Sequence, residues 1–349
     1  MPIHEEAAGC QRLAACCAAP PATKGLPPAA KGAKPSVPGI AASEAAHEIS
    51  TSGAFIRQQN RFTTPFGAEL PVVANRYRLL WARICPWAHR QVIALKLLGL
   101  DSVISIGTAN PVRTANGWEF SLDEGGVDPV LGIRYLAEAY VKADPSYTGR
   151  ATVPAIVDVS TGKVVNNDYF SLSNYWETVW SPFHKTGAPD LYPEALRAQI
   201  DALNKVLFNE VNNAVYKAGF AETQTEYDKA YDLLFARLDQ LEERLSNKRY
   251  LFGNRITDSD IRLYVTLARF DIAYHLVFKT NRNRLIDFPN LWNYAKDLYQ
   301  TPGFGDTTDF DAIKRGYHLG TQTTNPYQIL ALGPDTSIWK ETHNREALA

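Results

Sequence analysis

The chain has 349 residues, of which 45% are hydrophobic, and this length suffices for two globular domains with a sizeable core. Its formal net charge is −1 and basic and acidic residues are interspersed, so the sequence offers no basic patch for nucleic acid or an anionic membrane. Because no uninterrupted apolar stretch reaches the roughly 18 residues of a membrane span, we expect a soluble protein with neither kind of partner.

The N-terminal segment 1–45 is dominated by Ala, Pro, Gly and Lys and lacks periodic apolar positions. Such a composition buries too little apolar surface to fold, so the sequence predicts a disordered tail. The run AACCAAP is a poor signal-peptide core, and the early Glu5 and Glu6 argue against a transit peptide. We therefore expect a cytoplasmic protein.

The cysteines are distributed unevenly. Of the four, Cys10, Cys16 and Cys17 lie in the tail, which leaves Cys85 alone in the body of the chain. This excludes a disulfide framework there and indicates a reducing compartment. The seven histidines are scattered and no Cys or His pair has metal-ligand spacing, so we expect no metal.

Residues 77–99 predict a strand over Tyr77–Ile84 followed by a helix over Pro86–Leu98. Proline suits the first helical position because its missing N–H would have no partner there, and Gly99 supplies the stop. Cys85 is then the N-cap of the helix, a position where a thiol meets unpaired amides and the positive end of the helix dipole.

Three cations surround Cys85 in the sequence: Arg83, His89 and Arg90. Together with the helix terminus they favour the thiolate, so we expect a lowered thiol pKa. A CxxC protein releases its partner by attack of a second cysteine, but that position here is Ala88. A mixed disulfide on Cys85 must therefore be resolved by an outside thiol, which indicates a small-thiol transferase or reductase. The alternative is a buried structural cysteine.

A second strand over Ser102–Ile106, a long insertion over 107–150 and the hairpin TVPAIVDVSTGKVV complete a βαβ unit with an antiparallel extension. A thioredoxin-like domain over 46–182 is the simplest assembly. In that fold a cis-proline lies opposite the active cysteine, and Val153-Pro154 fits this position. An edge-strand proline is the alternative reading of Pro154.

After Trp180 the apolar period becomes helical. The sequence predicts an all-helical domain over 183–335 and a C-terminal tail over 336–349, with helices over Pro193–Lys217, Thr225–Ser246, Asp258–Phe278 and Phe288–Gln300. Thr257 with Asp260 predicts a capping box at the start of the third helix.

A thioredoxin-like domain with a cysteine at a helix start, followed by a helical domain, resembles the glutathione transferase fold. More specific segments resemble the glutathionyl-hydroquinone reductases, the Xi class of that superfamily. They run in consistent order from about residue 52 to 335 and include FIRQQNRF at 55–62, RYRLLWARICPWAHR at 76–90, GWEF at 117–120, ADPSYTGRATVP at 143–154, EVNNAVYKAGFA at 210–221, LEERLSNKRYLFG at 241–253, DFPNLWNYAKDLYQTPG at 287–303 and FDAIKRGYH at 310–318.

The resemblance implies that a glutathionyl-hydroquinone is reduced with glutathione as cosubstrate. Cys85 takes the nucleophile position, and Trp118, Val153 and, more weakly, Arg150 match groups that contact the thiol. Tyr216 and Tyr317 match the tyrosines of the aromatic acceptor pocket, where a phenol offers both ring surface and a hydroxyl donor. The family resemblance also implies a homodimer.

One segment departs from the family. Asp168-Tyr169 stands where family members present Glu and Ser to the γ-glutamyl end of glutathione, and FSLSNYW follows. Asp168 is one methylene shorter than Glu, and Tyr169 cannot mimic a small hydroxyl. A related enzyme that uses another small thiol, such as mycothiol, and an omega-like dehydroascorbate or deglutathionylating thioltransferase therefore stay open. A non-catalytic binding module would not need an activated cysteine.

Overall fold

The computed structural model describes residues 48–320 and 325–348, so the predicted tail over 1–45 lies outside the described residues. A four-stranded sheet carries the N-terminal half, in the order β2-β1-β3-β4. Its strands are β1 (Tyr77–Ala82), β2 (Ser105–Ala109), β3 (Ala155–Asp158) and β4 (Lys163–Asn166). β1 and β2 are parallel, with Arg78 opposite Ser105, whereas β1–β3 and β3–β4 are antiparallel. This is the predicted βαβ unit with its hairpin.

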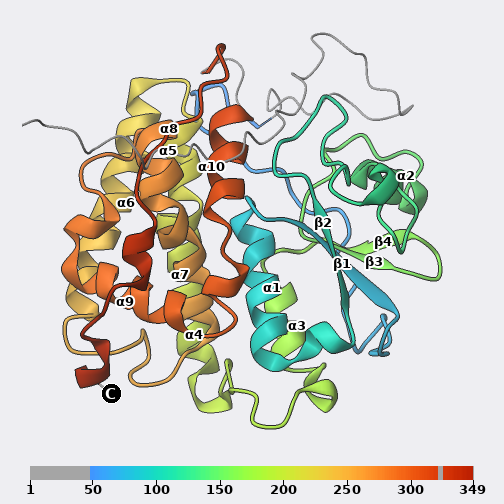
Figure 1. The fold of residues 1–349 in the computed structure, drawn as a ribbon, viewed down its shortest axis with the longest axis horizontal. Helices are drawn as coiled ribbons and strands as arrows, with labels where there is room; N and C mark the ends of the chain where they lie inside the picture. Colours follow the sequence, from blue (N-terminus) through green and yellow to red (C-terminus); the bar gives the residue numbers. More distant parts are fainter. Residues whose placement is uncertain (1–47, 321–324, 349) are drawn as a thin grey trace, which may run out of the picture. The chain divides into compact units, whose positions relative to one another are not determined.

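Helix α1 (Pro86–Leu98) connects the two parallel strands and has the predicted bounds. Gly99 ends it in the left-handed region, at φ 77°, where its N–H reaches the carbonyls of Leu95 and Lys96. All but one residue of α1 are buried, because the helix packs on β1, on α3 (Leu172–Glu177) and on α7 (Asp258–Arg269). Figure 1 shows α1 between the sheet and the helices of the C-terminal half. The start of α1 is therefore enclosed by both halves of the chain.

The insertion 107–150 packs on the sheet and contains α2 (Leu136–Ala143). A buried ion pair between Arg78 of β1 and Asp128 of the insertion, 2.8 Å long, ties the two together. Gly107 lies against this pair, and a Cβ there would come within 2.6 Å of the Asp128 carboxylate. The glycine is thus required for the close approach of β2 to the ion pair.

The second half is helical, as predicted. The short α3 (Leu172–Glu177) precedes it. Its α-helices are α4 (Arg197–Leu207), α5 (Ala214–Gly219), α6 (Gln224–Arg244), α7 (Asp258–Arg269), α8 (His275–Val277), α9 (Pro289–Gln300) and α10 (Phe310–Leu319). Thr257 and Asp260 form the predicted capping box at the start of α7. In the described part of the chain, no helix combines the length and the apolar character needed to cross a membrane.

Two of the predicted helices are not continuous. A π-turn over Phe208–Asn212 separates α4 from α5, and another over Phe270–Tyr274 separates α7 from α8. A π-turn adds a residue to the helical repeat and rotates the side chains that follow it, and such turns are frequent at functional sites. Periodicity alone predicts one unbroken helix in each case, because the apolar spacing continues through the turn.

The segment 336–349 was expected as a tail, yet its described residues pack on the helices. Trp339 is 7% exposed and its ring lies 4.9 Å from that of Trp292 and 5.3 Å from that of Phe310. Arg345 is fully buried and donates to the carbonyl of Leu245 at 2.7 Å. The buried indole of Trp339 and the guanidinium of Arg345 hold this segment to the body.

Candidate active site

Cys85 lies at the N-cap of α1 with extended backbone angles, φ −76° and ψ 116°, and Pro86 occupies the first helical position as predicted. Its side chain is 9% exposed. The Sγ–H donates to the carbonyl of Val153 at 3.3 Å, and the Val153–Pro154 bond is cis. The predicted cis-proline opposite the cysteine is confirmed, and Pro154 presents the Val153 backbone to the thiol.

The prediction of a lowered thiol pKa is wrong for the ligand-free site. Burial raises the pKa of Cys85 above its ordinary value, because the low-dielectric surroundings penalise the charged thiolate. The amides of Ala88 and Trp87 act in the opposite direction, as do the charges of Arg269 and Arg57. The helix terminus therefore contributes as expected, but desolvation outweighs it.

The cations that favour the thiolate are also not those expected from the sequence. Burial lowers the pKa of His89 well below its ordinary value, so its imidazole is neutral near pH 7 and pairs with Thr307 at 2.9 Å. Arg90 instead donates to the backbone carbonyl of Tyr169. Among the charged side chains, Arg269, the last residue of α7, lowers the thiol pKa most.

Arg269 is fully buried and binds the backbone that leads into Cys85. Its guanidinium donates to the carbonyl of Ile84 at 2.7 Å and to that of Arg83 at 2.9 Å. It also lies 3.2 Å from the Nδ1 of His89. The helical half thus fixes the position of the cysteine turn and adds a positive charge to it.

Three tyrosine hydroxyls meet beside this turn, and we call them the tyrosine cluster: Tyr216, Tyr274 and Tyr317. The hydroxyls of Tyr216 and Tyr317 are 2.6 Å apart, and those of Tyr274 and Tyr317 are 3.1 Å apart. The third pair, Tyr216 and Tyr274, is separated by 3.5 Å. Burial raises the pKa of each phenol, so all three are protonated near neutral pH and act as hydrogen-bond donors.

Trp87 joins the tyrosine cluster to the cysteine turn. Its ring lies 5.9 Å from that of Tyr216 and 5.0 Å from that of Tyr169, which also packs on Phe208. Asp168 is engaged locally, because one carboxylate oxygen accepts from the amide of Phe170 at 3.1 Å. The structure therefore places the Tyr169 ring in the aromatic wall of the site and Asp168 in its own turn.

The other two residues predicted to contact the thiol cosubstrate, Trp118 and Arg150, lie in the insertion 107–150. Trp118 is 8% exposed, and the guanidinium of Arg113 lies 5.3 Å from the centre of its ring. Arg113 is close enough to Cys85 for their charges to interact. Arg150 donates to both carboxylate oxygens of Glu48, at 2.9 and 2.8 Å. Its guanidinium is therefore partly engaged, and a role in thiol binding stays a prediction.

Sequence reasoning gave no role to Trp87, Arg57, Arg269 or Tyr274. Trp87 and Arg57 lie within segments that carried the family resemblance, so a local signal existed for both. Arg269 and Tyr274 had none, since they reach the site only through the packing of α7 and the π-turn that follows it.

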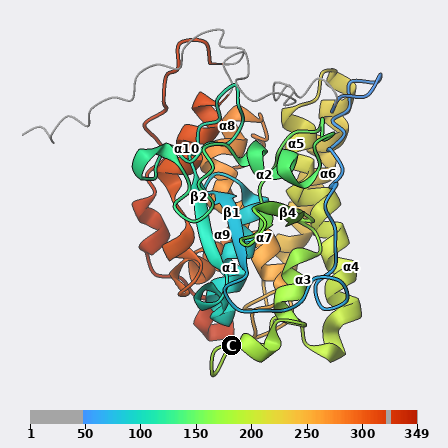
Figure 2. The same cartoon turned by 90° about the vertical axis from the view of Figure 1, so that its right-hand side faces the viewer.

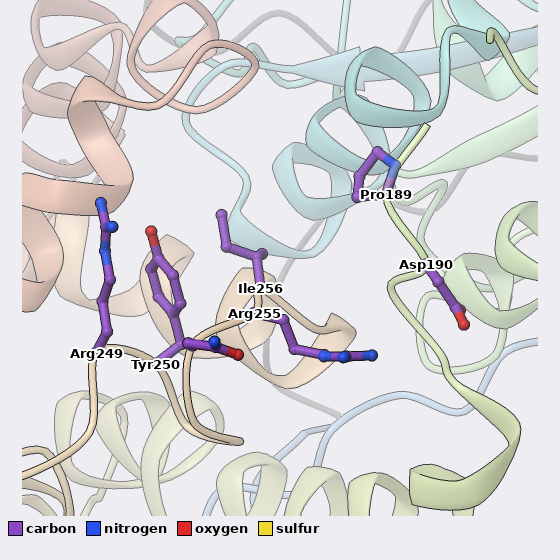
Figure 3. A pocket seen from close by; sticks show the side chains of 7 residues that line it. Pro189, Asp190, Arg249, Tyr250, Arg255 and Ile256 are labelled. Atoms are coloured by element: carbon purple, nitrogen blue, oxygen red, sulfur yellow. The ribbon is translucent and has the colours of Figure 1, made fainter. Parts of the chain in front are cut away.

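A hollow of about 480 Å³ lies elsewhere on the surface and is shown in Figure 3. Its lining holds no nucleophile, and its cationic Arg249 is paired with Asp297 at 2.8 Å. The lining residues are Pro189, Asp190, Arg249, Tyr250, Asn254, Arg255 and Ile256. Within residues 48–320 and 325–348, no group of three or more His, Cys, Asp or Glu could hold a metal ion.

Comparison with known proteins shows the family of the chain. Residues 224–297 match the family "Glutathione S-transferase, C-terminal domain". The chain is 38% identical over 309 residues to the glutathionyl-hydroquinone reductase YqjG of Escherichia coli, covering 85% of this chain and 94% of YqjG. The glutathione-bound structure of YqjG superposes with a TM-score of 0.76, covering 84% and 98% of the two chains.

Two further solved structures are similar. A glutathione transferase from Gordonia bronchialis is 52% identical, with a TM-score of 0.78 and coverage of 80% and 87% of the two chains. The glutathione transferase Xi from Phanerochaete chrysosporium is 37% identical, with a TM-score of 0.78 and coverage of 81% and 98%. The predicted fold, a thioredoxin-like domain followed by a helical domain, is thereby confirmed. The chain belongs to the glutathionyl-hydroquinone reductases, an enzyme family of the glutathione transferase superfamily.

Proposed function

We propose that the enzyme removes glutathione, or an analogous small thiol, from glutathionyl-hydroquinones through a mixed disulfide on Cys85. The observation that carries this proposal is a buried thiol that donates to the Val153 carbonyl and is close enough to Tyr216, of the tyrosine cluster, for their charges to interact. One side of the thiol offers backbone to a peptide-like cosubstrate. The other side offers rings and hydroxyl donors to an aromatic acceptor.

The chemistry balances without a metal or redox cofactor. The Cys85 thiolate attacks the glutathione sulfur, forming the S–S bond of the mixed disulfide as the carbon–sulfur bond breaks. The electron pair of that bond passes to the aromatic ring, which takes up a proton and leaves as the hydroquinone. A second thiolate then attacks the mixed disulfide, releasing the oxidised thiol and restoring Cys85.

The tyrosine cluster suits the departing ring. A phenol that stays protonated donates a hydrogen bond to an oxygen that gains negative charge, and preorganised donors of this kind stabilise the transition state. Raised pKa values keep Tyr216 and Tyr317 in this donor form. We propose that these two hydroxyls bind the acceptor oxygens, with Tyr274 orienting them.

The thiol side of the proposal rests on Trp118, Val153 and Arg150, as the resemblance implies. Asp168 and Tyr169 support an alternative cosubstrate. The Asp168 carboxylate also accepts from the side chain of Asn60 at 3.3 Å, and the Tyr169 ring occupies space that a serine would leave open. A small thiol without a γ-glutamyl end, such as mycothiol, would not need the missing Glu and Ser.

The proposal extends to the cellular setting. The family resemblance supports a homodimer. Cys10, Cys16 and Cys17 all lie in the N-terminal segment, so the body of the chain has no pair of cysteines that could form a disulfide, and this supports a location in the reducing cytoplasm. Both are tested by measuring the mass of the purified protein in solution and by fractionating host cells.

The test of the nucleophile is Cys85→Ser. We expect turnover of a glutathionyl-hydroquinone to disappear while the circular dichroism spectrum is unchanged. A variant with serine at Cys10, Cys16 and Cys17 is the matched control and should keep full activity. Mass spectrometry should find the thiol adduct on Cys85 alone. More than residual turnover by a folded Cys85→Ser variant would exclude the mechanism.

A further inference from the structure

Arg57 holds a positive charge between the cysteine turn and the tyrosine cluster. The central carbon of its guanidinium lies 4.6 Å from the ring centre of Trp87, 4.7 Å from that of Tyr216 and 5.2 Å from that of Phe55. Its Nε donates to the side-chain oxygen of Asn213 at 2.8 Å. Three aromatic faces and one amide therefore fix the plane of the guanidinium.

The backbone that carries Arg57 is tied to both halves of the chain. The carbonyl of Gly53 accepts from the amide of Glu222, at 2.9 Å, just before α6. The next residue after the arginine, Gln58, accepts from the amide of Arg150 at 2.9 Å and donates to its carbonyl at 3.1 Å. Figure 2 shows this segment running beside α5 and α6. Arg57 thus lies in an anchored segment, residues 53–61, which we call the strap and which holds the arginine at the site.

One nitrogen of the guanidinium has no acceptor. The Nη2 of Arg57 is buried and makes no hydrogen bond within the described part of the chain. Burial of a charged donor without an acceptor costs free energy, because the donor has lost its hydrogen bonds to water and gained none from the protein. The arrangement is suited to an anionic oxygen that arrives with a ligand and completes the hydrogen bonding.

The surroundings indicate the class of that ligand. The atoms around the guanidinium are mainly aromatic, and the Tyr216 ring that it contacts belongs to the tyrosine cluster. A flat ring that bears an oxygen fits between such surfaces. The charge also favours ionised forms of nearby acids, because it lowers the pKa of Tyr216 and of Tyr169 against the effect of burial.

We propose that Arg57 is a further catalytic residue, which binds the phenolate oxygen of the aromatic acceptor through Nη2. This inference rests on the proposed function. The ring carbon that bears the sulfur first takes up a proton while the ring hydroxyl loses one to solvent, which gives the keto form of the ring. When the carbon–sulfur bond then breaks, its electron pair restores the aromatic ring and negative charge accumulates on the ring oxygen, where the guanidinium stabilises it. The oxygen is protonated by solvent as the product leaves, so Arg57 keeps its own protons.

A binding measurement tests the proposal without turnover. The probe is 4-nitrophenol, whose ionised form absorbs in the visible range, titrated with the full-length protein. We expect the intact enzyme to lower the pKa of the bound phenol so that its ionisation constant rises about tenfold or more. Arg57→Gln should abolish this shift, and Arg57→Lys, which keeps the charge but loses the planar fork, should retain part of it.

Arg61→Gln is the matched control, because Arg61 lies in the same strap with its side chain 65% exposed and paired with Asp144. This variant should behave as the intact enzyme. A full shift in both Arg57 variants would overturn the proposal. So would weaker glutathione binding with an unchanged nitrophenol shift, since Nη2 would then serve a carboxylate of the thiol.

Steady-state kinetics provide a second, independent test of the role of Arg57. With a series of ring-halogenated glutathionyl-hydroquinones, Arg57→Gln should lower kcat/KM by about 10- to 100-fold, most for the least acidic phenol. Reduction of hydroxyethyl disulfide should fall much less, and only by the effect that loss of the Arg57 charge has on the Cys85 thiolate. Equal losses on both substrates would show that Arg57 acts through Cys85 and would refute the assignment. Absence of hydroquinone turnover in the intact enzyme would refute the proposed function alone, because the nitrophenol arm stands independently.

Discussion

Removing one hydroxyl from the tyrosine cluster tests whether the cluster binds the aromatic acceptor. Tyr317 makes the two shorter contacts, at 2.6 and 3.1 Å, whereas Tyr216 and Tyr274 are 3.5 Å apart, at the limit of a hydrogen bond. A neutral hydrogen bond contributes about 1 kcal/mol to stability. Tyr317→Phe should therefore lower the free energy of unfolding by about 2 kcal/mol, and Tyr274→Phe by about 1 kcal/mol. Urea denaturation measures both.

The same substitution separates the two halves of the active site. A hydrogen bond to a charged oxygen is worth about 1.5–3 kcal/mol, so Tyr317→Phe should lower kcat/KM for a glutathionyl-hydroquinone by about 10- to 100-fold. Tyr216→Phe should behave similarly. Both variants should reduce hydroxyethyl disulfide at nearly the normal rate, because that flexible substrate presents no ring oxygen.

The control for these variants is Tyr327→Phe, since this tyrosine is 86% exposed and its hydroxyl should not affect either substrate. Equal losses on the aromatic substrate and the disulfide would mean that the substitutions damage the thiol site. No loss on either would remove the tyrosines from the pocket. Each result is incompatible with hydroxyls that act on the aromatic acceptor alone.

Three further predictions concern the thiol and the termini. Burial raises the pKa of Cys85, and the thiolate is the reactive form. Alkylation of the enzyme should therefore speed up with rising pH and reach half its maximum at a higher pH than that of free cysteine; a plateau below pH 7 would contradict this. Deleting 1–45 should leave the melting temperature and specific activity nearly unchanged, whereas a fall of several degrees would show that this segment packs on the body. If Asp168 and Tyr169 select a thiol without a γ-glutamyl end, the double variant Asp168→Glu, Tyr169→Ser should raise a weak glutathione rate; a high rate with glutathione in the unmodified enzyme would rule out this selectivity.

The elements next to Cys85 could be predicted from the sequence, because local rules govern them. Proline at the first helical position and glycine at the C-terminus set the bounds of α1, which the structure reproduces. The cis-proline followed from the strand order around the hairpin and the resemblance. The sequence also named Tyr216 and Tyr317, through motifs rather than through any physical signal of their own, and the structure brings their hydroxyls together; their role in acceptor binding stays a prediction.

Only the tertiary structure decided what surrounds the thiol. The sequence places Arg83, His89 and Arg90 near Cys85, but the fold buries a neutral His89 there and brings Arg269 from 184 positions away along the chain. The sign of the thiol pKa shift follows from desolvation, which depends on packing from both halves of the chain and is invisible in a local motif.

The geometry of the tyrosine cluster also depends on tertiary packing and could not be predicted from the local sequence. Sequence periodicity continues through Phe270–Tyr274, so the π-turn that directs Tyr274 to the other two hydroxyls is a product of packing. Arg57 stands in a segment without regular secondary structure, and only the anchoring of that strap at α6 and Arg150 makes its charge part of the site. Local sequence determined that Cys85 lies at the N-cap of α1. Long-range packing determined which charges and hydroxyls face it, because those groups come from elements that meet only in the folded chain.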